Sequence, residues 1–349
     1  MKIDADFAGG NIKVVRLTEC DAWLEPNLSD TSEQWFYFNF RVREAEGKTV
    51  VFHMGGVPYG YVSPFGPGVS SDGEYYAFCP EKTKIDERTF KYAFGADEHE
   101  KYFAFSLPYT AKRFYEFAAK NGFEPFEFAL SEQGRQVPAI TMGTGEETIL
   151  LTCRHHACES VASYVLEGVV KEIKTLPIAR KFKFCIVPLM DVDGVENGDQ
   201  GKGRIPHDHN RDYAEENSIY ASVRAVKKFV GTEKVRAFLD FHNPWNYGGE
   251  NDNVMFVYGK NPDPDLDRLA AITEKLTAGD KLAYRTKNGV PLGKGWNKPS
   301  ANVKDFCIRR GAGISVSIET PYFGSALPTE DDFRTFGKKI ARALDEYFA

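Results

Sequence analysis

The sequence predicts a chain of two parts, a β-rich region over residues 1–107 and an α/β domain over residues 108–349. Three observations lead to this prediction. Short aromatic and β-branched runs, several of them separated by Gly/Pro-rich turns, fill the first hundred residues. After these runs, stretches with apolar residues at helical spacing alternate with strand-like stretches. The composition, with 42% hydrophobic and 27% charged residues, is that of an ordinary globular protein.

The first part is expected to be all-β and sandwich-like. Its candidate strands are WFYFNFRV, KTVVFHM, EYYAFCP, RTFKYAF and KYFAFSL, which begin at residues 35, 48, 74, 88 and 101. No helical pattern separates them, and short strands of this kind pack as a sandwich or a small barrel. The aromatic side chains could form a ligand-binding face, but the core of a sheet is the better explanation.

The second part begins with a helix over residues 110–122, which has an N-cap threonine and a terminal glycine. Two further helices, over residues 159–173 and 218–231, are predicted from apolar stripes at helical spacing, namely Val161, Val165, Val169 and Ile173, and Ile219, Val223, Val226 and Val230. The predicted strands are ETILLTC, KFKFCIVPLM, VRAFLDFH and GAGISVSIE. After Phe184, KFKFCIVPLM is apolar on both faces, as expected of a central strand.

Composition argues against several classes of protein. A net charge of −6 and the lack of a Lys/Arg-rich run argue against a nucleic-acid partner. No stretch approaches the ~20 apolar residues of a membrane helix, and the N-terminus MKIDADFAGG lacks the apolar region of a secretory signal. The six cysteines include no C-x-x-C pair. We therefore expect reduced thiols and a cytoplasmic protein that has no membrane partner.

The stretch LLTCRHHACES sets two adjacent histidines shortly before a glutamate. Zinc in hydrolytic sites commonly takes three protein ligands and leaves one position for water. His156 and Glu159 stand at i and i+3, and His155 and Glu159 at i and i+4, so either histidine shares a helical face with the glutamate. The spacing alone therefore leaves both histidines open as ligands.

VRAFLDFH supplies a candidate third ligand, His242. Period-two alternation puts Phe238, Asp240 and His242 on one face of this strand. An acid and an imidazole on a central strand require polar partners, because burying them alone is costly. The alternative is a strand end that emerges into solvent.

The loop sequence PHDHNRDY offers further candidates. His207 and His209 have the H-x-H spacing of metal ligands, although histidines on such loops more often form hydrogen bonds. Asn210 and Arg211 are a suitable receptor for a carboxylate, because the guanidinium donates in a fixed fork.

The last strand-like stretch, GISVSIE, places Ser315, Ser317 and Glu319 on the face opposite its aliphatic residues. A carboxylate beside small serines on an inner strand suits a general base in a cavity. The alternative is an exposed acid on an edge strand.

These parts, in this order, resemble the M14 family of zinc carboxypeptidases. The likeness is closest to the cytosolic carboxypeptidase branch, which has an aromatic strand like WFYFNF, a junction like FSLPYT and a phrase like IVPLMDVDGV. It implies an α/β zinc-carboxypeptidase-type domain, with a mixed central sheet flanked by helices, after a smaller all-β domain. It also implies one Zn²⁺ and a peptide or protein C-terminus as the substrate.

The resemblance also implies roles for residues. H-x-x-E begins at His156, so His156, Glu159 and His242 would bind zinc, and His155 would be a neighbour. The metal would acidify a bound water and polarise the scissile carbonyl. Glu319 would take the proton of the water and pass it to the leaving amine.

For the substrate, the resemblance implies that Asn210 and Arg211 hold the terminal carboxylate. Arg204, with Lys202 as the alternative, is the candidate cation for the tetrahedral oxyanion. The family pattern places Lys304 in the pocket for the C-terminal side chain, where a lysine would favour an acidic residue; a solvated surface lysine is the alternative. The β-rich domain is a candidate for binding a partner or the substrate.

The chain departs from the branch at two places. Ala157 and Cys158 replace a usual Pro-Gly pair, and Pro244 replaces a histidine after the third ligand. Neither change removes a zinc ligand, but both leave the substrate class open. The alternatives are a zinc amidohydrolase of the aspartoacylase or succinylglutamate desuccinylase type, and a binding module that retains the fold without catalysis.

Overall fold

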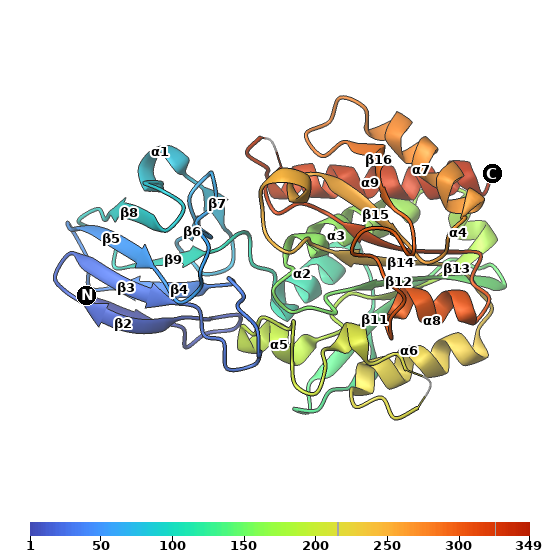
Figure 1. The fold of residues 1–349 in the computed structure, drawn as a ribbon, viewed down its shortest axis with the longest axis horizontal. Helices are drawn as coiled ribbons and strands as arrows, with labels where there is room; N and C mark the ends of the chain where they lie inside the picture. Colours follow the sequence, from blue (N-terminus) through green and yellow to red (C-terminus); the bar gives the residue numbers. More distant parts are fainter. Residues whose placement is uncertain (215, 325) are drawn as a thin grey trace. The chain divides into compact units, whose positions relative to one another are not determined.

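A computed structural model describes residues 1–214, 216–324 and 326–349. The chain divides into two compact units, whose elements are labelled in Figure 1. The first unit contains residues 1–113 and 194–206, and the second contains residues 114–193 and 207–349. The division expected from the sequence, between residues 107 and 108, stays a prediction.

The first unit is built on two sheets. The five-stranded sheet has the order β1-β4-β9-β6-β7, with β1 (Lys2–Asp4), β4 (Asn39–Arg43), β9 (Glu100–Ala104), β6 (Gly68–Ser70) and β7 (Ala77–Phe78). The four-stranded sheet has the order β2-β3-β5-β8, with β2 (Lys13–Leu17), β3 (Asp21–Glu25), β5 (Thr49–Met54) and β8 (Thr89–Ala93). One short helix, α1 (Pro80–Thr83), precedes β8. The all-β, sandwich-like N-terminal region expected from the sequence is confirmed.

Aromatic rings form the core of this unit. Phe40 and Phe103 come from the five-stranded sheet, and Phe52 and Phe90 come from the four-stranded sheet. All four are fully buried, and their ring centroids lie between 4.6 and 6.4 Å apart. The aromatic runs therefore serve as core, which is the interpretation favoured from the sequence.

The second unit has one mixed sheet of eight strands, in the order β10-β11-β13-β12-β14-β17-β15-β16. The strands are β10 (Phe126–Leu130), β11 (Gln136–Met142), β12 (Glu147–Cys153), β13 (Phe182–Val187), β14 (Val235–His242), β15 (Val254–Tyr258), β16 (Tyr284–Val290) and β17 (Ile314–Glu319). The four central strands, β13, β12, β14 and β17, are parallel. The outer strands β11 and β15 pair with them antiparallel.

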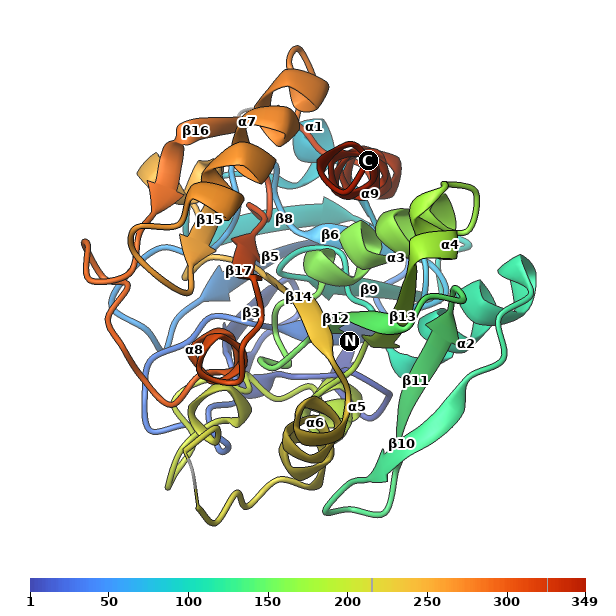
Figure 2. The ribbon, with the colours of Figure 1, turned by 90° about the vertical axis from the view of Figure 1, so that its right-hand side faces the viewer.

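Helices cover both faces of this sheet, as Figure 2 shows. On one face lie α3 (Val161–Ile173), α4 (Ile178–Lys181), α7 (Pro264–Thr277) and α9 (Glu330–Tyr347). On the other lie α6 (Ala221–Thr232) and α8 (Val303–Arg309). The remaining elements are α2 (Ala111–Asn121), α5 (Val192–Asn197), η1 (His209–Arg211) and η2 (Gly249–Asp252).

Helix α3 packs against α9 at very short range. A Cβ at Gly168 would collide with the carbonyl of Arg334, and one at Gly337 would collide with that of Val165. Only glycine allows two helix backbones to approach this closely. The contact fixes α3, whose N-terminal end follows Glu159.

Most predicted elements of the second unit are confirmed. The helix over residues 110–122 is α2, and ETILLTC and VRAFLDFH are β12 and β14. Some predicted limits were wrong. Ile219 precedes α6 and is exposed, because the chain is still extended there. In the first unit, WFYFNFRV is strand only from Asn39, and the amide of Tyr37 instead donates to Gln200 Oε1.

None of the described helices is both long and apolar enough to cross a bilayer.

Candidate metal centre

Three neighbouring parallel strands, β12, β14 and β17, end at the same edge of the sheet. Thr152 is the register partner of Asp240, and His242 is the register partner of Glu319. Carboxyl ends of parallel strands are where α/β proteins commonly bind ligands, because the loops that follow them converge there. Side chains from distant parts of the sequence are brought together at this edge.

The carboxylate of Glu159 lies between two imidazole rings. Its Oε1 is 2.8 Å from Nδ1 of His156, and its Oε2 is 2.7 Å from Nδ1 of His242. One candidate ligand atom from each of the three residues lies within 4.8 Å of the other two. Glu159 is 1% exposed, His242 is 2% exposed and His156 is 9% exposed, so this group is largely shielded from water.

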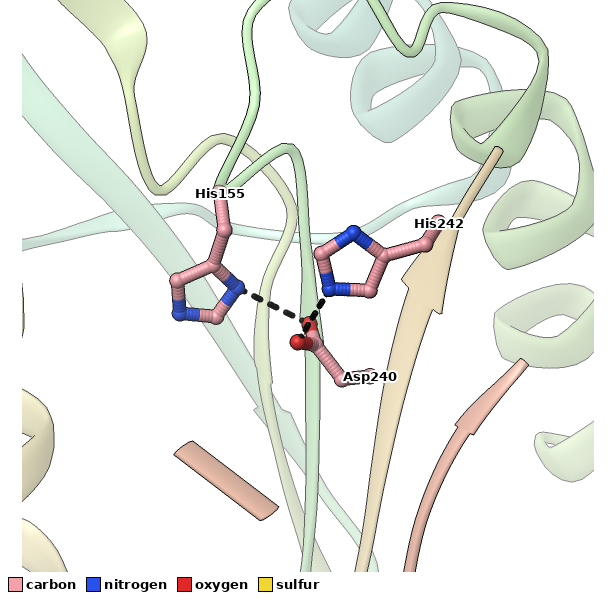
Figure 3. Close-up of side chains that lie close together, drawn as sticks. All are labelled: His155, Asp240 and His242. Carbon is pink, nitrogen blue, oxygen red and sulfur yellow. Dashed lines mark hydrogen bonds and ion pairs between the residues drawn. The ribbon is translucent and has the colours of Figure 1, made fainter. Parts of the chain in front are cut away.

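A second buried group shares His242 with the first. Figure 3 shows this second group, which consists of His155, Asp240 and His242. Asp240 Oδ2 is 2.6 Å from Nε2 of His242, and Asp240 Oδ1 is 2.9 Å from Nδ1 of His155. The hydroxyl of Thr152 donates to the same Oδ1 over 2.7 Å. The hydroxyl of Tyr213 is 2.8 Å from Nε2 of His155.

Burial and charge act in opposite directions on these groups. Burial alone would raise the pKa of the Asp240 carboxyl, but His155 and His242 hold this pKa well below its usual range. Burial would lower the pKa of His242, but Asp240 and Glu159 raise it well above its ordinary value. The pKa of His156 is also raised, because Glu159 and Asp208 outweigh the effect of burial. The site therefore favours positive charge between its carboxylates.

Arg154 and Asn243 hold the loop that carries His156. Arg154, between β12 and this loop, has a φ of +62° and donates from its guanidinium to the carbonyl of Ala157 and the hydroxyl of Ser163. The buried amide of Asn243 accepts from the backbone of Ala162 and donates to the carbonyl of Thr320, over 3.2 and 2.6 Å. These contacts join the segments that follow β12, β14 and β17.

The first group fits a zinc ion. Zinc is bound by two histidines and one carboxylate in many hydrolytic sites. Both Nδ1 atoms face the carboxylate of Glu159, so a cation bound by these three residues would take the place of the protons in their hydrogen bonds. The Nε2 atom of each ring also has a carboxylate nearby. Asp240 Oδ2 lies 2.6 Å from Nε2 of His242, and Asp208 Oδ1 lies 3.6 Å from Nε2 of His156. Such outer partners orient metal-binding imidazoles.

Other predicted site residues lie at or near this edge. The amide nitrogen of Asn210 is 3.4 Å from Nε2 of His242, and the exposed Arg211 donates to the carbonyl of Asn210 over 3.0 Å. Glu319 neighbours His242 in the sheet register. Lys304, at the start of α8, is 3% exposed, and its Nζ is 3.0 Å from Asp305 Oδ1. A solvated surface lysine is therefore the wrong description of Lys304.

Arg204 and Lys202 belong to the first unit. Arg204 donates to Asp199 over 2.9 Å, and the Nζ of Lys202 lies 4.8 Å from the centroid of the Trp35 ring. In the loop of the second unit, His207 contacts Asp212 over 2.7 Å, and His209 stacks on Tyr220. Within the described residues, neither of these two histidines belongs to a group that could hold a metal.

The sequence left one part of the centre unassigned. The alternation in VRAFLDFH indicated that Asp240 needs a polar partner, and that partner includes His155. Adjacent histidines carry no signal of which ring turns toward which strand, so the pairing of His155 with Asp240 and Tyr213 could not be predicted. Only the register of β12 against β14 reveals it.

Comparison with known proteins identifies the family. The zinc carboxypeptidase family model matches residues 118–347, and the model of the cytosolic carboxypeptidase N-terminal domain matches residues 3–106. The chain belongs to the zinc carboxypeptidase family. It is therefore a metallocarboxypeptidase, a hydrolase, and zinc is the metal that this family implies. The resemblance seen in the sequence is confirmed, and the family favours the peptidase over the amidohydrolase and the non-catalytic module.

Relatives and solved structures agree with this assignment. Cytosolic carboxypeptidase 6 from Mus musculus is 26% identical over 100% of this chain and 73% of its own length. A metallo-carboxypeptidase from Burkholderia cenocepacia has a TM-score of 0.81 at 18% identity, covering 99% of this chain and 98% of its own. A metallo-carboxypeptidase from Pseudomonas aeruginosa, solved with (2-guanidinoethylmercapto)succinic acid, has a TM-score of 0.79 at 21% identity over 99% and 98%. These structures support the expected fold.

Proposed function

We propose that His156, Glu159 and His242 hold the zinc ion of this carboxypeptidase and that Glu319 is its general base. The observation that carries the proposal is the position of the Glu159 carboxylate, 2.8 and 2.7 Å from the two Nδ1 atoms. Two neutral imidazoles and one carboxylate would supply the three protein ligands that zinc commonly takes in hydrolytic sites.

Bound zinc would lower the pKa of water and polarise a carbonyl oxygen. A residue of the protein must then carry a proton from the attacking water to the leaving amine. Glu319 follows Ser317 on the face that carries Asp240 and His242, and it lies beside His242 in the sheet register. Its carboxylate would accept a proton from water and donate it to the leaving amine. The reaction is hydrolysis of the C-terminal peptide bond of a peptide or a protein tail.

Glu319→Gln tests the base. The amide has the shape of the carboxylate but cannot accept the proton, so we expect kcat to fall by about 10²- to 10⁴-fold. Zinc content should not change, because Glu319 is not one of the proposed ligands. Glu172→Gln, at a carboxylate that binds Arg342 on α9, is the matched control. Unaltered activity in Glu319→Gln would remove Glu319 from the mechanism.

Asn210 and Arg211 are proposed to hold the terminal carboxylate of the substrate. Support comes from the distance of 3.4 Å between the Asn210 amide and His242, and from the exposure of the residue Arg211. An arginine fork binds a carboxylate through two parallel hydrogen bonds. A peptide with a free C-terminus should be cleaved, and the same peptide with a C-terminal amide should not. Equal turnover of both would contradict this role.

Arg204 is proposed as the cation that stabilises the tetrahedral oxyanion, with Lys202 as the alternative. Its guanidinium binds Asp199 in the first unit, which orients it and leaves it charged. If Arg204 acts on the transition state, Arg204→Gln lowers kcat far more than it raises KM. A larger effect of Lys202→Met on kcat would transfer the role to Lys202.

Lys304 is proposed to favour substrates with an acidic C-terminal residue. Burial lowers the pKa of Lys304 in spite of the neighbouring Asp305, so the ammonium gains from a second negative charge. The order of kcat/KM for peptides ending in Glu, Phe and Lys measures the preference. Asp305→Asn should strengthen the preference for Glu, because the ammonium loses its competing partner, and Lys304→Met should abolish it. A wild-type preference for Phe would contradict the proposal.

We also propose the cytoplasm as the location of the protein. Several relatives bear the name cytosolic carboxypeptidase, and all six cysteines are free thiols. The N-terminal unit is proposed to bind a partner or the substrate. Cell fractionation tests the first statement, and turnover of protein tails against short peptides tests the second.

A further inference from the structure

Five side chains form a buried network beside the proposed zinc ligands, and we call it the Asp240 network. Its members are Thr152 from the end of β12, His155 from the following loop, Tyr213 from the segment after η1, and Asp240 and His242 from β14. Figure 3 shows its centre, where the two rings approach the carboxylate from different directions. All five side chains are almost completely inaccessible to water. The proposed catalytic steps use none of them except His242.

Asp240 decides where the protons of both rings lie. An ionised carboxylate only accepts hydrogen bonds. Its Oδ2 therefore accepts from Nε2 of His242 over 2.6 Å, and its Oδ1 accepts from Nδ1 of His155 over 2.9 Å. With its proton on Nε2, a neutral His242 has the lone pair on Nδ1. That nitrogen is the one that faces Glu159.

His155 and Thr152 in turn hold Asp240. When Nδ1 of His155 donates to Asp240, its Nε2 accepts from the hydroxyl of Tyr213 over 2.8 Å. This ring is therefore fixed at both nitrogens. The hydroxyl of Thr152 donates to the same Oδ1 over 2.7 Å, so this oxygen accepts two hydrogen bonds. The carboxylate has no freedom to turn away from His242.

We propose that Asp240 is a positioning residue of the metal centre, which fixes the tautomer of His242 so that Nδ1 presents its lone pair to zinc, and that His155 supports Asp240. The inference rests on the proposed role of His242 as a ligand. A histidine that binds a metal usually donates its other N–H to an outer partner, which orients the ring and raises its basicity. Here that partner is charged, so it also offsets the positive charge that coordination places on the ring.

The same three side chains, His155, Asp240 and His242, could instead hold a second cation. The hydrogen bonds favour the positioning role. Asp240 Oδ1 already accepts from a hydroxyl and an imidazole, and Nε2 of His155 faces a hydroxyl rather than an open position. The number of zinc ions bound per chain separates the two cases.

The test is the dissociation constant of zinc, measured on the full chain by competition with a chromophoric chelator. Asp240→Asn keeps the shape, but its amide donates to Nε2 of His242 and so moves the ring proton to Nδ1. We expect zinc affinity to fall by about 10- to 100-fold. The control is Glu167→Gln, at a buried carboxylate that binds Arg334 over 2.7 Å in the same unit, and it should not change zinc affinity.

Position 155 supplies a second pair of variants. His155→Asn keeps an N–H donor near the place of Nδ1 and should retain zinc affinity close to that of the wild type. His155→Leu removes the donor and should weaken zinc binding. In the cobalt-substituted protein, Asp240→Asn and His155→Leu should shift the visible absorption bands of the metal, whereas His155→Asn and Glu167→Gln should not. A shift in the bands reports ligand geometry, which a general loss of stability does not change.

Each outcome has one meaning. Weaker zinc binding in Asp240→Asn and His155→Leu, with rescue by His155→Asn, supports the proposal. Wild-type affinity in Asp240→Asn overturns it, and so does a fall from two bound zinc ions to one, which would make Asp240 a ligand. His242→Ala separates the ligand role of His242 from the positioning role of Asp240. If His242→Ala binds zinc normally, the ligand assignment itself is wrong; if only His242→Ala loses zinc, the positioning role alone is wrong.

Discussion

The two units bury opposite kinds of side chain at their centres. In the first unit, Phe40, Phe52, Phe90 and Phe103 interlock between two sheets with no polar atom in their side chains. In the second, the carboxyl edge of the sheet buries three histidines and two carboxylates, and each histidine lies within hydrogen-bonding distance of a carboxylate. Both groups are almost inaccessible to water. Only the aromatic group stabilises the fold through the hydrophobic effect alone, because its side chains are apolar.

The contrast indicates that the aromatic core serves stability and that the polar edge of the second unit serves function. Burying an aromatic ring stabilises a fold in proportion to the apolar area removed from water. Burying charged groups costs free energy unless each one has a partner, and even a paired group often contributes less than an apolar replacement would. The buried polar groups at the carboxyl edge of the sheet therefore cost free energy of folding. Their arrangement is explained by the metal ion that they can bind.

Removing the metal should have the largest effect on both activity and stability. Chelation is expected to abolish peptidase activity and to reduce the stability of the second unit, because the metal-free site keeps charged groups buried without their cation. At free zinc about 1,000 times its Kd, binding adds about 4 kcal/mol to the free energy of unfolding. Thermal unfolding with and without chelator, together with peptide turnover, measures both effects.

The control for chelation is the choice of metal that is added back. Zinc should restore activity and stability, and magnesium should not, because magnesium prefers six oxygen ligands and this site offers two imidazoles. If magnesium restores activity equally well, a His₂Glu zinc site does not explain the chemistry.

The next largest effect is expected in the aromatic core. Phe52→Ala leaves a cavity between the two sheets and should reduce stability by about 3–5 kcal/mol. Hydrogen exchange of peptides from β5 and β8 would report the loss, and zinc affinity should remain that of the wild type. Phe126→Ala, at an exposed ring on β10, is the matched control and should have little effect. A large loss of zinc affinity in Phe52→Ala would contradict the separation of stability from function.

Sequence reasoning recovered the features that repeat along the chain. Alternation in VRAFLDFH gave both the limits of β14 and the shared face of Asp240 and His242, because a strand has a period of two. The helical stripe of Val161, Val165, Val169 and Ile173 is buried as predicted, since a period near 3.6 marks one helix face. Local periodicity depends only on the order of the residues, so it can be recognised in the sequence before the fold is known.

What the sequence could not supply depends on register and direction. The limits of the strand in WFYFNFRV were missed, because Phe36 and Phe38 are as apolar as a strand requires but lie before β4 begins. The partner of His155 depends on β12 pairing with β14, which are more than eighty residues apart. The choice between His155 and His156 came from a family pattern, since helical spacing allowed both.

A smaller effect is expected from Asn243, which joins the segments around the metal centre. Asn243→Ala removes the acceptor for the amide of Ala162 and the donor to the carbonyl of Thr320. Leaving buried backbone groups without partners should cost about 1–3 kcal/mol of stability. Urea unfolding measures this cost, and Asn253→Ala, where the amide donates to a backbone carbonyl at an exposed site, is the control. Equal stability of Asn243→Ala and the wild type would mean that water replaces both contacts.

The smallest effect should appear in the first unit, where Asp4 binds Arg41 and Arg43. Burial would raise the pKa of the Asp4 carboxyl, but the two guanidinium groups lower it below its ordinary value. A carboxyl with a depressed pKa stabilises the fold above its unfolded pKa, and this contribution disappears as the pH falls through the folded pKa. Asp4→Asn should therefore be less stable than the wild type at pH 7 by about 0.5–1 kcal/mol. The difference should vanish in acid, below the folded pKa, and hydrogen exchange of β1 and β4 at both pH values measures it. A difference that persists unchanged in acid would assign the effect to packing rather than to charge.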